Sequence, residues 1–240
     1  MKKEKIMLIL VPILLAIISI IAYISISSIG KDSLKFKREY ESYNNKSIYD
    51  NVNYINLNIS FNNPIKYSNY DEIFKVLNSE TGIIFLGSPK IQDSRNIVNT
   101  LLKSVNDKKI NKIYYLDITN DMDSYIVEDN KLVYELDSNG NELKGTENYH
   151  KLLEKLDNYA ISYSIEYDDK VFEVPNKKVY IPTVLFVRNG TIVGAHMSTL
   201  ESHESMNEKL TTEEEEELYN IFIENIELMQ TEVCDINSSC

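Results

Sequence analysis

Residues 82–96, GIIFLGSPKIQDSRN, decide the fold of this chain. The apolar run at 83–86 meets a Gly-Ser-Pro sequence that breaks regular structure, and a helical apolar pattern follows over 97–102. These features predict a buried strand that leads through a tight loop into a helix. Such a junction is a common ligand site in α/β proteins, because the first backbone N–H groups of the helix and the positive end of its dipole point toward it.

The flanking segments extend this pattern in both directions. Residues 54–61, YINLNISF, alternate apolar and polar residues and predict a half-buried strand, and residues 70–77 have apolar residues at helical spacing. Downstream, a helix is predicted from about 94 to 105, and residues 113–118 predict another buried strand. The order strand, helix, strand, helix, strand favours an α/β sheet with parallel neighbours.

The second half of the chain begins with an irregular region. Residues 120–178 show no sustained period, apart from a helix predicted at 149–156 and a turn signal at Asn139-Gly140 that is typical of a hairpin. We interpret this region as an insertion into the sheet-forming part of the chain.

Regular patterns return near the end. The sequence predicts a continuous apolar strand at 184–187, a hairpin turn at 188–190 and a second strand at 191–196. Thr212 and Glu215 have the spacing of a capping box, which predicts the start of a last helix. The apolar face of that helix contains Leu218, Phe222, Ile226, Met229 and Val233.

The composition fits a globular domain and argues against one class of partner. The chain has 240 residues, of which 43% are hydrophobic and 26% are charged, so it can fill a core of ordinary size. Its formal net charge is −12. A phosphate backbone would repel so acidic a protein, and we therefore expect no nucleic-acid partner.

The N-terminal part predicts a membrane anchor. Residues 6–29 carry no charge, and roughly 20 apolar residues span a bilayer, whereas a signal-peptide core needs about 7–15. No small-x-small cleavage site follows, so we interpret 6–29 as an uncleaved transmembrane signal anchor; the alternative is a long signal peptide that is cut near 27–30. The numbers of basic residues before and after the segment are nearly equal, so they do not decide its orientation in the membrane. The short tail, 1–5, favours a cytoplasmic N-terminus. The polar residues 30–53 are interpreted as a stalk that holds the domain outside the cytoplasmic membrane.

Together these elements resemble the thioredoxin fold. The resemblance rests on GSPKIQDSRN at 87–96 and IPTVLFVRNGTIVG at 181–194, and it covers roughly residues 54–230. The closer match is to membrane-anchored thioredoxin-like proteins of low-GC Gram-positive bacteria, in which a Gly-x-Pro-x-Cys-x-x-Cys-Arg run occupies the first place. The resemblance implies an α/β fold with a central mixed sheet flanked by helices, and with the insertion at about 120–178 placed before the cis-proline strand.

The cysteine pair that forms the active site of this family is missing. Ile91 and Ser94 occupy the two cysteine positions, while Gly87, Pro89 and Arg95 of the pattern remain. An isoleucine side chain and a serine hydroxyl cannot exchange a disulfide, so we expect no dithiol oxidoreductase activity here and assign no catalytic residue. A native loss of the cysteines and a recent or engineered substitution both fit the sequence.

The peptide-binding part of the family site is retained. The resemblance implies that Pro182 is cis and that the backbone of Ile181 pairs with an extended peptide beside position 91. Ile91, Ile181 and Pro182 are therefore the expected peptide-binding residues. An X-Pro bond otherwise favours trans by about 0.5–1 kcal/mol, and the alternative is an ordinary trans proline that opens a strand.

Cysteine and histidine positions complete the list of candidate sites. Cys234 and Cys240, in the tail 231–240, are close in sequence, which favours a small local disulfide in an oxidising compartment; the alternative is a redox pair served by another protein. These two residues lack the further ligands of a structural zinc site. The spacing of His196 and His203 matches no known ligand pattern, and we expect neither a metal nor another cofactor.

Two functional hypotheses follow. The first is a membrane-tethered, extracytoplasmic, non-enzymatic domain that holds an extended peptide or a partner protein. The alternative is a thiol-disulfide relay or substrate that works through Cys234 and Cys240. Replacing both cysteines with serine distinguishes them, because a binding module would keep its partner and a relay would lose its function.

Overall fold

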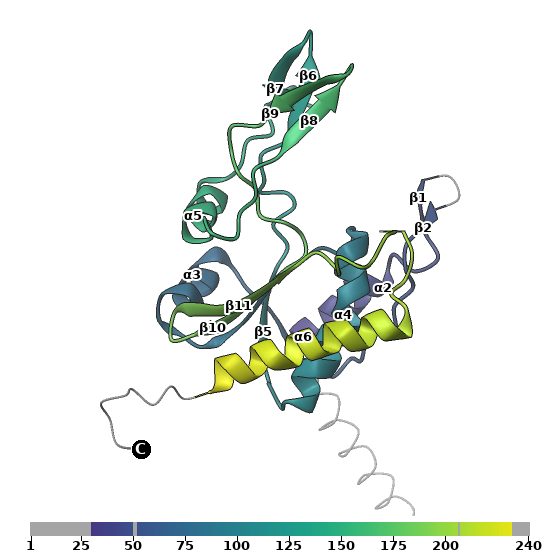
Figure 1. The fold of residues 1–240 in the computed structure, drawn as a ribbon, viewed down its shortest axis with the longest axis vertical. Helices are drawn as coiled ribbons and strands as arrows, with labels where there is room; N and C mark the ends of the chain where they lie inside the picture. The colour runs from purple at the N-terminus through teal and green to yellow at the C-terminus, as the bar shows by residue number, and fades with distance from the viewer. Residues whose placement is uncertain (1–29, 50–51, 206, 232–240) are drawn as a thin grey trace, which may run out of the picture.

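The centre of the molecule is a five-stranded mixed sheet (Figure 1). The computed structural model describes residues 30–49, 52–205 and 207–231. The strand order is β11-β10-β4-β5-β3, in which β3 and β4 run parallel to β5, and β10 runs antiparallel to both β4 and β11. This order is compatible with a thioredoxin-like fold. The strands are β3 (Ile65–Tyr67), β4 (Gly82–Leu86), β5 (Ile113–Leu116), β10 (Thr183–Arg188) and β11 (Thr191–Met197).

Helices cover both faces of this sheet (Figure 1). Those in the described part of the chain are α2 (Lys31–Glu41), α3 (Tyr70–Ser79), α4 (Gln92–Asp107), α5 (Glu147–Lys155) and α6 (Thr212–Gln230). Helices α2, α4 and α6 share one core with Ile83 and Phe85 of β4. Helices α3 and α5 share the other core with Ile84 and Leu86. Because both faces are covered, β4 is a continuous apolar run and shows no polar alternation.

The prediction of a stalk at 30–53 is wrong, because the N-terminal region, defined here as residues 30–49 and 52–53, packs on the sheet domain. Residues 31–41 form α2, and its Phe36 and Tyr40 side chains are fully buried against the sheet. The centroid of the Phe36 ring lies 4.9 Å from that of Tyr115 in β5, in an edge-on arrangement. Two aromatic residues one helical turn apart attach an otherwise polar helix, because each buries a large apolar area. The other elements of this region are β1 (Ser47–Tyr49) and β2 (Val52–Asn53).

The segment 54–61 is only partly as predicted. Its apolar residues Ile55, Leu57 and Ile59 are buried, as the alternation indicates. The segment is nevertheless not a strand of the sheet, and the first sheet strand is β3. The prediction of a strand at 54–61 is therefore wrong, although the predicted burial of one side is confirmed. A period of two in the sequence indicates which side chains are buried and does not show what the backbone is hydrogen-bonded to.

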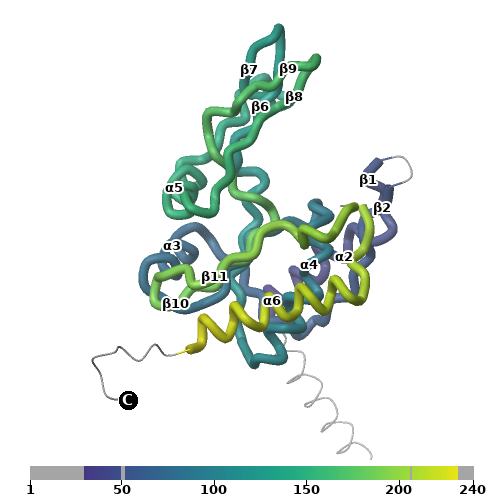
Figure 2. Tube along the Cα trace, viewed as in Figure 1, coloured from purple at the N-terminus to yellow at the C-terminus, as the bar shows by residue number. Residues whose placement is uncertain are grey.

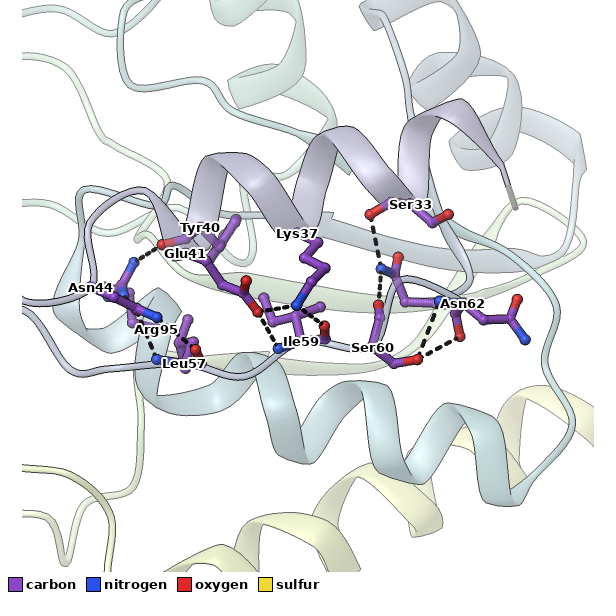
Figure 3. A network of polar contacts seen from close by, with 11 residues as sticks. Ser33, Lys37, Tyr40, Glu41, Asn44, Leu57, Ile59, Ser60, Asn62 and Arg95 are labelled. Carbon is purple, nitrogen blue, oxygen red and sulfur yellow. Dashed lines mark hydrogen bonds and ion pairs between the residues drawn. The ribbon is translucent and has the colours of Figure 1, made fainter. Parts of the chain in front are cut away.

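Side chains take the place of a neighbouring strand along this segment (Figure 3). Asn44 accepts a hydrogen bond from the Leu57 N–H at 2.9 Å and donates one to the Leu57 carbonyl at 2.7 Å. At Ile59, the N–H donates to the Glu41 carboxylate and the carbonyl accepts from the Lys37 ammonium, both at 2.7 Å. The backbone of 54–61 is thus tied to α2 and to the turn that follows it.

The insertion forms two hairpins that project beyond α5, away from the sheet (Figures 1 and 2). The first hairpin turns at Asp129-Asn130, where both residues have positive φ, while the predicted turn at Asn139-Gly140 closes a shorter loop. The second hairpin, which was not predicted, turns at Asp168-Asp169. Asp and Asn tolerate this backbone region better than most residues. The strands are β6 (Tyr125–Glu128), β7 (Lys131–Tyr134), β8 (Ser164–Tyr167) and β9 (Lys170–Glu173).

Most other predicted boundaries are confirmed within a few residues. The last helix has a capping box one residue earlier than predicted, at Thr211 and Glu214. The predicted anchor at 6–29, Val233 and both cysteines lie outside the described residues. Within the described residues, no helix is both long enough and apolar enough to cross a membrane.

Candidate functional site

The predicted junction lies at the carboxyl end of β4. Ile91 is the N-cap residue of α4, and its side chain forms no capping hydrogen bond. Ser94, in the first turn, is fully buried, and its Oγ accepts a hydrogen bond from the Ser88 N–H at 3.1 Å. Ser94 therefore fixes the loop from inside, whereas Ile91 is partly exposed to solvent.

The Ile181-Pro182 peptide bond is cis, as the resemblance implies. The Pro182 carbonyl accepts a hydrogen bond from the Ser198 N–H at 2.9 Å, and the Tyr180 carbonyl accepts one from the Thr183 hydroxyl at 2.7 Å. Among the residues that the structure describes, none accepts a hydrogen bond from the Ile181 N–H and none donates one to the Ile181 carbonyl. The backbone of Ile181 is therefore available to an added strand or an extended peptide.

A cleft of about 510 Å³ brings Ile91 and Ile181 together. Pro182 borders it in sequence but does not line it, and Ser94 lies beneath the surface. A larger hollow of about 940 Å³ lies at the other end of β4, next to Gly82, and shares no residue with the junction. The apolar part of the cleft lining is formed by Ile48, Ile91, Met122, Val179 and Ile181.

Asp93, the second residue of α4, also lines this cleft and was not predicted as a site residue. Its side chain is only 3% exposed. Oδ2 accepts hydrogen bonds from the Ser198 hydroxyl at 3.2 Å and the Tyr180 hydroxyl at 3.4 Å. Oδ1 is buried and accepts no hydrogen bond from the described residues. Burial raises the pKa of the Asp93 carboxyl, and the hydroxyls of Ser198 and Tyr180 and the charge of His203 only partly oppose this rise.

Arg95 holds the loop and the N-terminal region in place. Its side chain is fully buried, and burial lowers the pKa of its guanidinium group. The guanidinium donates to the carbonyls of Ile55 (2.6 and 2.9 Å), Tyr40 (2.6 Å) and Pro89 (3.2 Å), and to the Asn44 side-chain oxygen (2.9 Å). One cation thus joins the junction loop to α2 and to the segment 54–61.

The histidines do not form a shared site. The ring of His203 lies 3.0 Å from the Glu214 carboxylate, whereas that of His196 packs edge-on against Phe222 with 5.3 Å between ring centroids. Across the described ranges, no group of three or more His, Cys, Asp or Glu side chains is arranged to hold a metal ion. Neither histidine reaches the cleft between Ile91 and Ile181.

The burial of Asp93 predicts a pH-dependent effect on stability. We expect Asp93→Asn to raise the free energy of unfolding by about 1 kcal/mol at pH 7, because it removes a buried charge whose hydrogen bonds are incomplete. The folded-state pKa of Asp93 lies above its ordinary value of 3.8, so the ionised group lowers stability as the pH rises through the folded-state pKa. The gain from the substitution is therefore expected to disappear as the pH falls to 3.8, as measured by urea unfolding across this range.

Asp71 provides the matched control. It is also the second residue of its helix, α3, but it is exposed. Asp71→Asn is expected to lower stability by about 0.3–1 kcal/mol through loss of a favourable helix-dipole interaction. Equal effects of the two substitutions at pH 7 would show that burial does not destabilise the ionised Asp93.

Comparison with known proteins provides no family assignment. A scan against family models and searches of curated proteins and of solved structures found no match.

Proposed function

We propose that this protein is a non-catalytic binding module with a thioredoxin-like fold, which holds an extended peptide or a segment of a partner protein. The strand order of the sheet, the strand-to-helix junction after β4 and the cis bond before Pro182 support the assignment of the fold. The domain includes α2 in addition to the region 54–230, because α2 belongs to the same apolar core.

The observation that carries the proposal is the pairing of an apolar side chain with a free backbone in one cleft. Ile91 offers an apolar contact at the start of α4, and Ile181 offers an N–H and a carbonyl without partners among the described residues. An extended peptide can satisfy both, through main-chain hydrogen bonds and through burial of one side chain. Dithiol exchange is chemically excluded at this place by Ile91 and Ser94.

The proposed location follows from the sequence. Residues 6–29 anchor the chain in the cell membrane as a single span, and the domain lies on the extracytoplasmic side. Cys234 and Cys240 form a structural disulfide there. Within this proposal the partner is a peptide or protein that reaches the outer face of the membrane, and no nucleic acid or cofactor takes part.

Substitution of Ile91 tests the proposal. Heptapeptides are selected from a random phage-displayed library against the full-length protein in detergent micelles, and their affinities are measured by fluorescence anisotropy. Ile91→Ser is expected to weaken binding by about tenfold or more, because it removes an apolar contact that contributes roughly 1.5–3 kcal/mol when fully buried. Serine is a preferred N-cap residue, so α4 is expected to stay intact.

Ile126→Ser is the matched control. Ile126 lies in β6 on the projecting hairpin and is 39% exposed, so this substitution also removes an accessible isoleucine but leaves the cleft unchanged. It is expected to leave peptide affinity unaltered. Failure of the library to yield any peptide, or equal losses for the two variants, would overturn the proposed function.

A further inference from the structure

The cleft contains a buried acceptor that the proposed peptide-binding role does not yet use. Asp93 Oδ1 is one of the few buried side-chain polar atoms without a partner in the described chain; the others belong to Tyr40, Tyr115 and His196. Of these residues, Asp93 alone lines the cleft. A buried acceptor without a donor costs free energy, commonly about 1–3 kcal/mol, and its persistence in a cleft indicates a ligand that supplies the donor.

The hydrogen bonds of Asp93 link its carboxyl to the proposed peptide-binding segment. Its Oδ2 is held by Tyr180, which precedes Ile181, and by Ser198, whose N–H also bonds to the Pro182 carbonyl. The carboxyl is thus connected to the segment that presents the free backbone. An aspartate in the first turn of a helix is common and does not by itself indicate a ligand. A buried carboxylate oxygen without a hydrogen-bond partner among the described residues does point to one.

Within the described residues no ion pair completes this carboxyl, although the charge of His203 acts on it. Lys90 and Lys178 line the same cleft, but Lys90 is exposed and the ammonium group of Lys178 lies 4.1 Å from the centre of the Tyr163 ring. A ligand can therefore supply the missing donor, and the net charge of −12 attracts a cationic ligand to the protein as a whole.

The hydrogen bonds of Asp93 favour a lysine ammonium group on the ligand over an arginine guanidinium group. Oδ2 already accepts two hydrogen bonds, so the unused hydrogen-bonding capacity of this carboxyl lies at the buried Oδ1. Arginine binds carboxylates best through both oxygens at once, whereas the lysine ammonium group acts as a compact point charge. The lysine stem can pack along apolar lining such as Ile91 and Ile181 while its head reaches a polar group.

We infer that this cleft recognises a lysine side chain of the extended peptide, with the aliphatic stem between Ile91 and Ile181 and the ammonium group donating to Asp93 Oδ1. This inference rests on the proposed function and specifies the peptides that the module selects. The ligand class is a peptide with a lysine next to the residue that pairs with Ile181.

The test uses lysine and norleucine, which have the same straight stem with and without the amine. Peptides selected by the full-length protein are expected to be enriched in lysine at one position. Replacement of that lysine with norleucine is expected to weaken binding by about 10- to 100-fold. In Asp93→Asn the ratio between the two peptides is expected to fall below about threefold, while Asp71→Asn keeps the ratio of the original protein.

The possible outcomes separate this inference from the proposed function. Selected peptides that bind in the cleft without lysine enrichment, or a lysine preference that persists in Asp93→Asn, would overturn the inference and leave the binding module in place. Absence of any selected peptide would overturn the proposed function itself. Because Asp93→Asn is expected to be more stable than the original protein, a loss of lysine preference in this variant cannot be assigned to unfolding.

Discussion

Replacing Arg95 with methionine is expected to lower the free energy of unfolding by about 3–5 kcal/mol, as measured by urea denaturation. The substitution leaves the carbonyls of Ile55, Tyr40 and Pro89 without their common donor, and each buried group left unsatisfied costs about 1–3 kcal/mol. Methionine fills much of the same space, so the loss reports mainly the hydrogen bonds. The N-terminal region, the segment 54–61 and the loop before Ile91 are expected to loosen together.

Two further variants sharpen this prediction. Arg95→Lys keeps the positive charge but lacks the planar fork that reaches several carbonyls, so it is expected to recover less than half of the loss. Arg38→Met replaces an exposed arginine of α2 and is expected to change stability by no more than about 0.5 kcal/mol. A loss below about 1 kcal/mol for Arg95→Met would show that the region is held by apolar contacts alone.

Introducing cysteines at positions 91 and 94 is expected to create a redox-active disulfide in a chain that has none there. The variant combines Ile91→Cys and Ser94→Cys with Cys234→Ser and Cys240→Ser. The two positions are the N-cap and the third residue of α4, and one turn of separation suits the Cα distance of a disulfide, about 4.4–6.8 Å. The helix N-terminus is expected to lower the pKa of the new thiol at position 91 below about 8.5, the value of a free cysteine.

The measurement is the fraction of bonded protein in glutathione buffers, determined by mass spectrometry after thiol trapping. The matched control is Thr100→Cys with Lys103→Cys in the same background, which places the same spacing in the interior of α4. The control is expected to stay reduced under conditions that oxidise the first pair, because its thiols lie in the interior of α4, away from the helix N-terminus that lowers a thiol pKa. If the thiols at 91 and 94 also stay free, the junction does not have the geometry of a thioredoxin-like site.

The locally encoded parts of this fold could be predicted from the sequence. The apolar run of β4 and the helical spacing of α4 each identify their element without reference to the rest of the chain. The hairpin between β10 and β11 turns at Asn189-Gly190, where both residues have positive φ, and this dipeptide is a strong local signal. These elements place Ile91 and Ile181, the two predicted residues that meet in the cleft.

The remaining features depend on contacts between distant residues. The segment 54–61 bonds to Asn44 and Arg95, and the latter lies 40 residues from Ile55. Asp93 has the sequence position of an ordinary first-turn acid, and its burial depends on Tyr180 and Ser198, which are 87 and 105 residues away. Nothing in the period or composition near Asp93 could indicate which of its oxygens lacks a partner.

The expected effects of Asp93 on stability and on binding have opposite signs. The ionised carboxyl lowers the stability of the folded domain, and in the inferred role it provides the preference for lysine. Such an exchange of stability for recognition is common at binding sites, where a polar group lacks a hydrogen-bond partner until the ligand supplies one. A variant that gains stability and loses selectivity would therefore support both interpretations of this residue.

Hydrogen exchange of the Ile181 amide tests the central claim most directly. The full-length protein is measured by amide exchange with mass spectrometry, with and without a saturating heptapeptide from the selection. If an extended peptide pairs with this backbone, exchange at Ile181 is expected to slow at least tenfold, with smaller effects around Ile91 and none in β6 to β9. Unchanged exchange at Ile181 together with protection of the projecting hairpins would contradict the account, because it would place the peptide on the insertion and not in the cleft.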